Sequence, residues 1–283
     1  MTAPPDDDTH KRIDAALGHW TQGDCVVGAQ WFVHRLAPEA PLTEESAAAA
    51  KNGADLAETE VAGFVVVSQS CDVVRSCVER PYVEVAPLVE VGNEKLKTIE
   101  RARWPRYAFV PGLRKRALVG DLDRIMTVEK AVVAGWERVS GCVTDTERRD
   151  FAQALARKRT RFAFPDDFTA LASKLQGRLQ EKHDRLSEEG AALRALREIR
   201  VRAAPSWDDD VIDIMLWFVR NEDEPDFEGR SWHKILEGWL KLMPAAGRFR
   251  AVDGVVMTLD DLTARDFVES DPLDLDHLSS PPA

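Results

Sequence analysis

The sequence predicts an α+β protein in which a small antiparallel, barrel-like β part precedes an α+β part. Short apolar runs separated by Gly and Pro recur up to about residue 143, which is typical of a bent antiparallel sheet. From Thr144 onward the apolar residues recur at helical spacing, and two further strand-like runs follow at residues 196–203 and 211–219. We therefore expect a disordered tail with a short helix (1–20), a barrel-like domain (21–143), an α+β domain (144–270) and an acidic tail (271–283).

The first part of the chain gives alternating signals for helix and strand. Residues 1–9 are rich in Pro and Asp and are expected to be disordered. The segments that follow are a helix at 11–20, a strand at 25–36, and a connection at 38–60 that carries a short helix at 44–51. Strands are expected at 64–68, 82–91, 106–113 and 117–130, the last interrupted once by a bulge. Three consecutive valines in the run at 64–68 predict a strand covered on both faces.

The second part opens with a helix-capping pattern. Thr144 with Glu147 three residues later predicts a capping box and a first helix. A second helix is expected from Pro165 to a stop at Gly190. The remaining elements are strands at 196–203 and 211–219 joined by a turn at 207–210, a helix at 231–242 and a hairpin at 249–259 around Asp253-Gly254. Residues 270–278 resemble a short docking segment that would bind either its own domain or a partner, and we expect its own domain.

The composition and the number of cysteines narrow the class of protein. The chain has 283 residues, of which 44% are hydrophobic and 31% are charged, as in an ordinary globular protein with a real core. No apolar run is long enough to span a bilayer, and the acidic start does not look like a signal peptide, so we expect a cytoplasmic protein. Four scattered cysteines are too few for a disulfide framework and should be free thiols.

Charge is distributed unevenly along the chain. The net charge is −11, yet residues 95–202 carry 25 Lys and Arg against 15 Asp and Glu. The flanking segments are acidic, with 6 basic against 16 acidic residues before this stretch and 7 against 18 after it. A basic surface for phosphates is one interpretation; mutual neutralisation of the segments by packing is the other.

Small polar residues interrupt the apolar run that ends at Val67. Ser68, Cys71 and Asp72 lie in this break, and a nucleophilic cysteine there would need a cation or a histidine beside it. His34, on the preceding strand, would supply the base if the two strands pair so as to bring it close. The alternative is a polar turn whose Ser and Asp side chains bond to the backbone.

The sequence contains no strong metal or cofactor signal. It has no Cys-x-x-Cys pair, no histidine pair at helical spacing and no Gly-rich phosphate loop, so no metal and no cofactor are predicted. Three consecutive carboxylates at 208–210 would point in different directions in an extended strand, so we expect a solvated turn there.

Cations alternate with aromatic residues between residues 95 and 116. Arginine and aromatic side chains together are what single-stranded nucleic acid binds, through phosphate neutralisation and base stacking. The predicted nucleic-acid-binding residues are Arg101, Arg103, Trp104, Arg106, Tyr107, Arg114, Lys115 and Arg116. A second cluster, Arg157-Lys158-Arg159, would also be explained by its place at a helix C-terminus.

The order of elements between residues 23 and 133 resembles the small SH3-like barrel of the MazF/PemK toxin family of endoribonucleases. The similar segments are Gly23-Asp24-Cys25-Val26-Val27, the strand from Tyr82 to Leu88, and Leu122 to Lys130. The resemblance implies a barrel and a role in RNA binding or toxin–antitoxin defence. Where the family has the Thr-Ser that supports RNA cleavage, this chain has Val89-Glu90, so the implied barrel is a degenerate one.

Three functions follow as hypotheses. The first is a cytoplasmic binding protein that contacts RNA, DNA or an acidic protein partner through the basic central segment. The second is an enzyme centred on Cys71, Asp72 and Ser68 that acts on a nucleotide or nucleic acid. The third is a structural subunit of a larger assembly, suggested by the acidic tail and the eight tryptophans. No membrane partner is expected.

Overall fold

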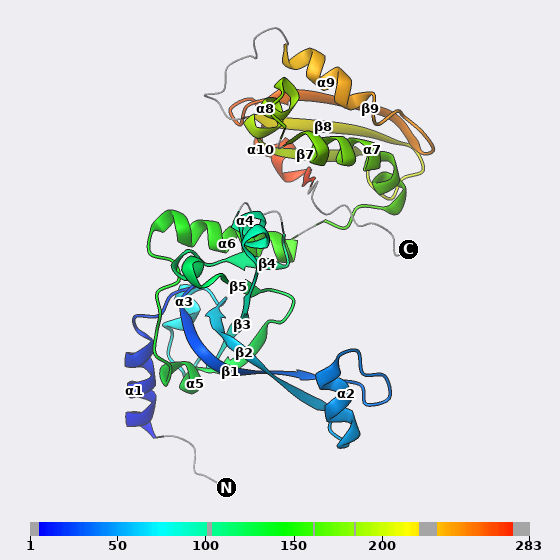
Figure 1. The fold of residues 1–283 in the computed structure, drawn as a ribbon. Helices are drawn as coiled ribbons and strands as arrows, with labels where there is room; N and C mark the ends of the chain where they lie inside the picture. Colours follow the sequence, from blue (N-terminus) through cyan, green and yellow to red (C-terminus); the bar gives the residue numbers. More distant parts are fainter. Residues whose placement is uncertain (1–5, 101–103, 161, 184, 221–230, 274–283) are drawn as a thin grey trace. The chain divides into compact units, whose positions relative to one another are not determined.

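The computed structural model describes residues 6–100, 104–160, 162–183, 185–220 and 231–273, and it contains both helices and antiparallel strands, as an α+β class requires. The chain divides into two compact units, residues 1–160 and 161–283 (Figure 1). The division falls at residue 160 rather than at the expected 143. The helix that follows Thr144 belongs to the first unit because it buries Phe151 and Leu155 in that unit's core.

The first unit is built around a six-stranded sheet. Its elements are α1 (Asp7–Leu17), β1 (Cys25–Arg35), α2 (Glu44–Lys51), β2 (Leu56–Val66), α3 (Ser70–Val73), β3 (Tyr82–Glu90), α4 (Asn93–Glu100), β4 (Tyr107–Phe109), the 3₁₀ helix η1 (Pro111–Arg116), β5 (Leu118–Asp121), β6 (Met126–Glu129), α5 (Lys130–Ala134) and α6 (Asp145–Thr160). The strand order is β1-β2-β3-β5-β4, and β6 also pairs with β3. All these pairings are antiparallel.

The sheet is curved, but the described ladders do not close it into a barrel. β1 and β2 bend together and run out as a two-stranded arm with α2 beside its tip (Figure 1). Gly28 and Gly63, at φ +133° and +138°, lie beside the register shift between Val27 and Gln30 where the arm leaves the sheet. Within residues 6–100 and 104–160, no ladder joins β4 or β6 back to β1. The closed barrel implied by the resemblance is therefore not present in these pairings.

Both faces of the central strands are covered, as the valine run predicted. On one face Val65, Ala86 and Leu88 pack with Phe151 and Leu155 of α6. On the other face a second cluster joins the sheet to α1 and the segment around α5, and it contains Leu17, Trp20, Phe64, Val66, Val83, Val85 and Val133. Because both faces of this strand are buried, its residues do not have to alternate between apolar and polar. This explains the continuous apolar sequence.

Three expected elements in this unit were wrong in detail. The predicted strand at 106–113 is only the short β4, because Pro111 begins η1. The predicted connection at 38–60 ends earlier, since Leu56 already begins β2 opposite Arg35. The expected tail at residues 1–9 is shorter, because Asp6 caps α1 by accepting from the Thr9 N–H at 2.9 Å.

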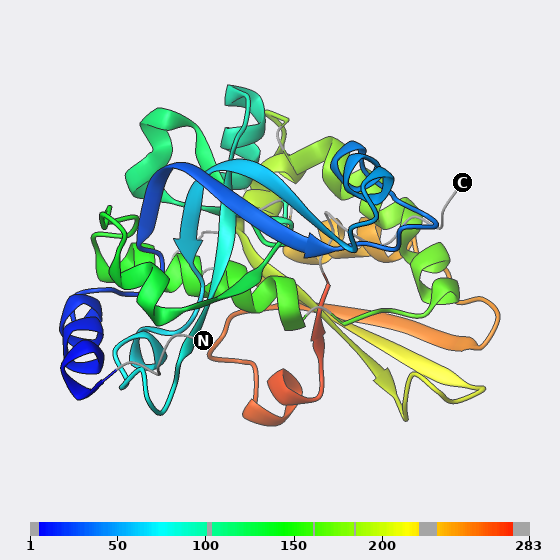
Figure 2. The same cartoon turned by 90° about the horizontal axis from the view of Figure 1, so that it is seen from below.

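The second unit is a four-stranded sheet with helices on both sides. Its elements are α7 (Asp166–His183), α8 (Glu188–Ala195), β7 (Leu196–Ala204), β8 (Ile212–Arg220), α9 (Trp232–Leu240), β9 (Phe249–Met257), α10 (Ala264–Val268) and β10 (Asp271–Pro272), with strand order β10-β7-β8-β9. α7, α8 and α9 contribute to the core on one face. α10 lies on the other face (Figure 2). There Arg200 stacks on Phe267 of α10.

Two predictions for this unit were wrong. The expected hairpin at 249–259 is one continuous strand, because β9 pairs with β8 in parallel along its length. Gly254 lies within this strand rather than in a turn, and a Cβ there would lie 3.1 Å from the Leu216 carbonyl oxygen and 3.2 Å from the Leu240 side chain, which is tight packing. The second helix stops at His183 rather than Gly190, and Leu186 beyond it is fully exposed.

The C-terminal docking segment binds its own unit as far as the structure describes it. β10 pairs with β7 and Leu273 is buried in the core. The expected boundary at residue 270 therefore cuts through packed structure, and the remainder of the predicted acidic tail, residues 274–283, lies outside the described residues.

Candidate nucleic-acid interface

The turn at residues 68–72 is a junction of backbone hydrogen bonds. The Ser68 hydroxyl accepts from the Glu84 N–H at 2.8 Å, and the Ser70 hydroxyl accepts from the Gln22 N–H at 3.0 Å. The Gln22 side chain in turn donates to the Val67 carbonyl at 2.8 Å. These small polar side chains therefore fasten the end of β2 to its neighbours, which accounts for their presence without catalysis.

Cys71 is exposed, and the structure gives it no base. Its thiol lies 3.7 Å from the Gln69 side-chain oxygen, and no histidine of the described residues hydrogen-bonds to it. β1 and β2 do pair, but the antiparallel register sets Cys25 opposite Val65 and His34 opposite Ala57. His34 therefore lies toward the far end of the arm, where it contacts Ser46 at 3.0 Å instead of approaching Cys71.

Asp72 forms a hydrogen bond through its backbone carbonyl group. Its carbonyl oxygen accepts from the ammonium of Lys130, a side chain that is 1% exposed. The structure thus places Ser68, Cys71 and Asp72 in one turn but assembles no nucleophile–base pair there.

The basic segment is built on a helix that the sequence analysis missed. α4 begins after Gly92 and buries Leu96 and Ile99 against Val119. The i, i+3 spacing of these two apolar residues is the pattern that could have predicted this helix, but the stretch was interpreted only by its charged residues. Arg101 and Arg103 fall outside the described residues, whereas Trp104 and Tyr107 pack partly buried against the α4 cluster.

Each aromatic ring of this surface has a cation beside it. The Lys95 ammonium lies 5.5 Å from the centroid of the Trp104 ring, and the Arg106 guanidinium carbon lies 5.1 Å from that of Tyr107. The two ring centroids are 5.9 Å apart. At exposed sites a cation–π contact of this kind is worth about 0.5–1 kcal/mol. The structure therefore brings Trp104, Arg106 and Tyr107 together.

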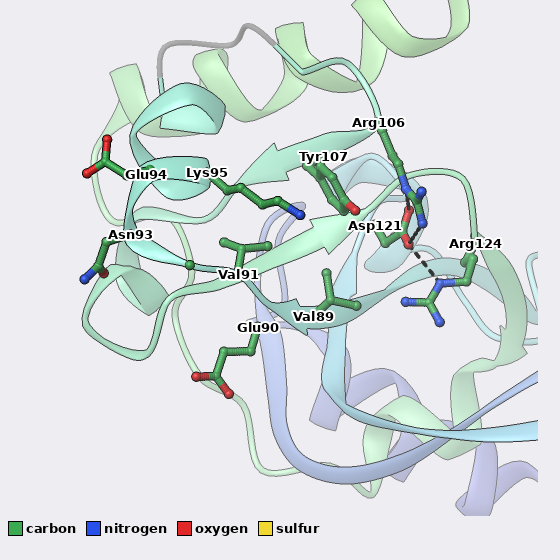
Figure 3. A pocket seen from close by; sticks show the side chains of 11 residues that line it. Val89, Glu90, Val91, Asn93, Glu94, Lys95, Arg106, Tyr107, Asp121 and Arg124 are labelled. Atoms are coloured by element: carbon green, nitrogen blue, oxygen red, sulfur yellow. Dashed lines mark hydrogen bonds and ion pairs between the residues drawn. The ribbon is translucent and has the colours of Figure 1, made fainter.

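A buried carboxylate fixes two of the arginines. Asp121 is completely buried. Its carboxylate accepts two hydrogen bonds from Arg106, at 3.2 and 3.0 Å, and one from Arg124 at 2.9 Å (Figure 3). Burial alone would raise the pKa of Asp121, but hydrogen bonds from Arg106, Arg124 and the Asp123 N–H outweigh it and lower that pKa. Neither Asp121 nor Arg124 was among the predicted residues, because only the return of β5 beside β4 brings them to Arg106.

The three predicted cations after β4 lie on η1. Arg114 pairs with Glu100 at the end of α4 at 3.1 Å. Lys115 and Arg116 are exposed, and no carboxylate of the described residues pairs with either. η1 thus supplies two uncompensated charges next to the end of α4.

A cavity of about 480 Å³ opens between the end of β3, the start of α4 and the β4–β5 pair. Its lining residues are Val89, Glu90, Val91, Gly92, Asn93, Glu94, Lys95, Arg106, Tyr107, Asp121 and Arg124. Figure 3 shows that the Lys95 side chain reaches across toward Tyr107, while those of Asn93, Glu90 and Glu94 point away from it. The part of the cavity around Tyr107 therefore combines an apolar wall with the Lys95, Arg106 and Arg124 cations.

Packing neutralises part of the basic segment. Arg138 binds the buried Asp24 at 2.8 Å, and Arg159 binds Glu84 at 2.7 Å. Lys158 of the second predicted cluster pairs with Asp123. Neutralisation by packing thus accounts for several cations of the basic segment, whereas Lys115 and Arg116 of η1 remain exposed.

Other site types find no support in the part of the chain that is described. No group of three or more His, Cys, Asp or Glu side chains there could hold a metal ion. No described helix has both the length and the apolar character needed to cross a membrane. Comparison with family models, curated proteins and solved structures found no match to this chain.

Proposed function

We propose that the first unit binds single-stranded nucleic acid through the surface formed by α4, β4 and η1. The observation that carries this proposal is the pairing of cations with rings, Lys95 with Trp104 and Arg106 with Tyr107. Bases stack on aromatic rings while nearby cations neutralise the phosphates, and the same surface then tolerates many sequences.

The η1 cations extend this surface. Lys115 and Arg116 are free of carboxylate partners within the described residues, so a phosphate can approach without first breaking an ion pair. The acidic net charge of −11 limits non-specific attraction elsewhere on the chain. Binding should therefore be local and strongly dependent on salt.

The resemblance to MazF/PemK toxins forms part of the proposal for the fold. β3 pairs with β2, β5 and β6, as a strand shared by the two halves of a small barrel would. We propose a degenerate, open relative of that barrel that binds nucleic acid without the family's cleavage residues. A cytoplasmic setting belongs to the same proposal, because all four cysteines are free thiols.

A second candidate, a subunit of a larger assembly, is favoured by the outer face of the β1–β2 arm. Trp31 is 55% exposed, and Val33 and Leu56 are exposed near it on the same ladder. Exposed apolar residues gathered on one face often mark protein contacts. If this face binds a protein partner, Trp31→Ser will lower the assembly's mass in analytical ultracentrifugation.

The Cys71-centred enzyme has only the exposure of its thiol in its favour. An assay for strand cleavage, run alongside binding, tests it directly. Cleavage by the wild type that Cys71→Ala abolishes would establish the enzyme in place of a binding module.

The binding proposal is tested by fluorescence anisotropy with labelled single-stranded RNA and DNA at two salt concentrations. Neutralising η1 with Lys115→Gln and Arg116→Gln should weaken binding of all sequences and reduce the salt slope by about 0.7 for each phosphate that is no longer neutralised. The matched control is Lys11→Gln with Arg12→Gln on α1, which changes the charge equally on a helix that packs against α5. Equal affinities and slopes in the two double variants would refute the proposal.

A further inference from the structure

We infer that the cavity beside α4 seats one unpaired nucleotide of the bound strand, with its base against Tyr107 and its phosphate among Lys95, Arg106 and Arg124. This inference rests on the proposed function and adds a defined base-binding pocket to it. It concerns the cavity, whereas the surface argued above includes Trp104 and η1 outside it.

The interior of the cavity has two chemically different sides. Val89 and Val91 face it from the end of β3, and Tyr107 lines it from β4 (Figure 3). Lys95, Arg106 and Arg124 bring three positive charges to the same space. Of the three lining carboxylates, Asp121 binds both arginines, whereas the Glu90 and Glu94 side chains point away from Tyr107 (Figure 3). A ligand that fits both sides must carry a flat apolar group and an anion within a few ångströms of each other.

The size of the cavity agrees with one such unit. At about 480 Å³ it lies within the range of roughly 300–1,000 Å³ usual for small-ligand pockets. Base-paired nucleic acid presents its bases stacked between two backbones and can place one in such a hollow only after unpairing and unstacking it, at a cost of a few kcal/mol. An unpaired nucleotide can turn its base inward while its neighbours follow the outer surface.

The walls of the cavity are held by hydrogen bonds within the protein. Val89 is held by the β3–β5 ladder opposite Val119, and the Val91 N–H donates to the Ala117 carbonyl at 3.0 Å. Asp121 orients Arg106 and Arg124 through the hydrogen bonds given above. Little ordering would therefore be needed on binding, which favours affinity.

A bare inorganic anion is a poorer match. It would use the cations but would leave Val89, Val91 and the Tyr107 ring without a partner. An aliphatic ligand would use the wall and leave the cations unpaired. Only a ligand with both parts uses the whole lining, and the nucleotides of a strand already bound to this surface provide it.

The test fills the cavity without changing its charge. Val91→Phe adds a ring to the wall, and the matched control Val132→Phe adds the same ring to an exposed position on α5. Both full-length variants and the wild type are titrated with labelled oligothymidine and with an abasic deoxyribose-phosphate strand of equal length. We expect Val91→Phe to weaken oligothymidine binding about tenfold, the value of one stacked base, with no change for the abasic strand. Val132→Phe should match the wild type.

A second measurement needs no variant and so does not depend on how Val91→Phe folds. Thymidine 5′-monophosphate should displace the labelled strand from wild-type protein at a concentration about tenfold lower than ribose 5-phosphate or inorganic phosphate requires. Thermal denaturation establishes that Val91→Phe is folded under the conditions used.

The outcomes separate this inference from the proposed function. If oligothymidine binds the wild type and Val91→Phe equally, and the nucleotide competes no better than inorganic phosphate, the cavity is not a base pocket although the surface still binds strands. If the wild type binds neither strand, the proposed function fails and this inference fails with it.

Discussion

The ammonium of Lys130 donates to the carbonyl oxygen of Asp72 at 2.8 Å, which ties the start of α5 to the turn that carries Cys71. The same ammonium also donates to the Arg75 carbonyl. Burial lowers the pKa of Lys130, and the nearby Asp14 carboxylate opposes that shift. The turn at residues 68–72 is thus held from within by a buried cation, so its polar sequence serves the fold.

Replacing Lys130 with Met should destabilise the first unit. Two carbonyl oxygens would lose a charged donor, and we expect the free energy of unfolding to fall by about 2 kcal/mol. Urea denaturation of the variant and of Lys97→Met, an exposed control, measures the difference. If Lys130→Met proves as stable as the wild type, the desolvation of the ammonium offsets its hydrogen bonds and the anchoring argument fails.

Cys71 should be the first cysteine to react in the native protein. It is exposed, whereas Cys25, Cys77 and Cys142 are buried. Burial raises the pKa of Cys25 and Cys77, and raises that of Cys142 to about 12, so these three have little thiolate at neutral pH. Iodoacetamide labelling followed by peptide mass spectrometry should modify Cys71 alone until the chain is unfolded. Early modification of Cys142 would contradict the buried environment described for it.

Local patterns predicted the elements whose signals lie within a few residues. The capping box is present, with the Glu147 carboxylate accepting from the Thr144 N–H at 3.0 Å and the Thr144 hydroxyl accepting from the Glu147 N–H at 3.1 Å. The short helix at 44–51 and the strictly alternating strand at 196–203 were also found, because period and cap are local properties. The strand predicted at 117–130 with a single bulge is instead two strands, β5 and β6, which pair with different parts of β3.

Relationships between distant segments could not be predicted in this way. His34 was a candidate base for Cys71, but strand register decides its distance, and register depends on pairing along the whole arm. Asp121 joins Arg106 only because β5 returns beside β4. The parallel pairing of β9 with β8 likewise depends on the crossover through α9, which turned a predicted Asp253-Gly254 hairpin into a straight strand.

The charge of Asp121 should contribute fully to stability above about pH 4 and progressively less below it. Its pKa is lower in the folded protein than in the unfolded chain, so its contribution is complete above the unfolded value and is lost as the pH falls through the folded value. Asp121→Asn should cost about 1–3 kcal/mol at pH 7 and should show a smaller loss on acidification than the wild type. Denaturant titrations between pH 2 and 7, with the exposed Asp8→Asn as control, measure both effects. A parallel pH dependence in wild type and Asp121→Asn would contradict the assignment.

Gly63 should tolerate no side chain, whereas Gly28 should tolerate one at a moderate cost. Both have positive φ, but a Cβ on Gly63 would lie 2.1 Å from the Val26 carbonyl oxygen, while one on Gly28 would meet nothing within 4 Å. Gly28→Ala therefore measures backbone strain alone, about 1–2 kcal/mol. Gly63→Ala adds the collision with β1 and should lower the thermal midpoint considerably further. Equal midpoints would show that the two strands separate readily where the arm leaves the sheet.

Arg200 should hold α10 and β10 against the second unit's sheet. Its guanidinium is buried, stacks 4.0 Å from the centroid of the Phe267 ring, and donates to the Ser270 hydroxyl at 2.8 Å and to the carbonyls of Phe267 and Ser270. Arg200→Met leaves these acceptors unpaired, which should cost about 3 kcal/mol. Because β10 has only two residues, the loss should appear first as faster hydrogen exchange in residues 264–273, with the β7–β8 ladder still protected. Arg197→Met, on the same strand but exposed, serves as the control. Unchanged exchange in residues 264–273 of Arg200→Met would mean that Leu273 and the two β10 pairings hold this segment without the arginine.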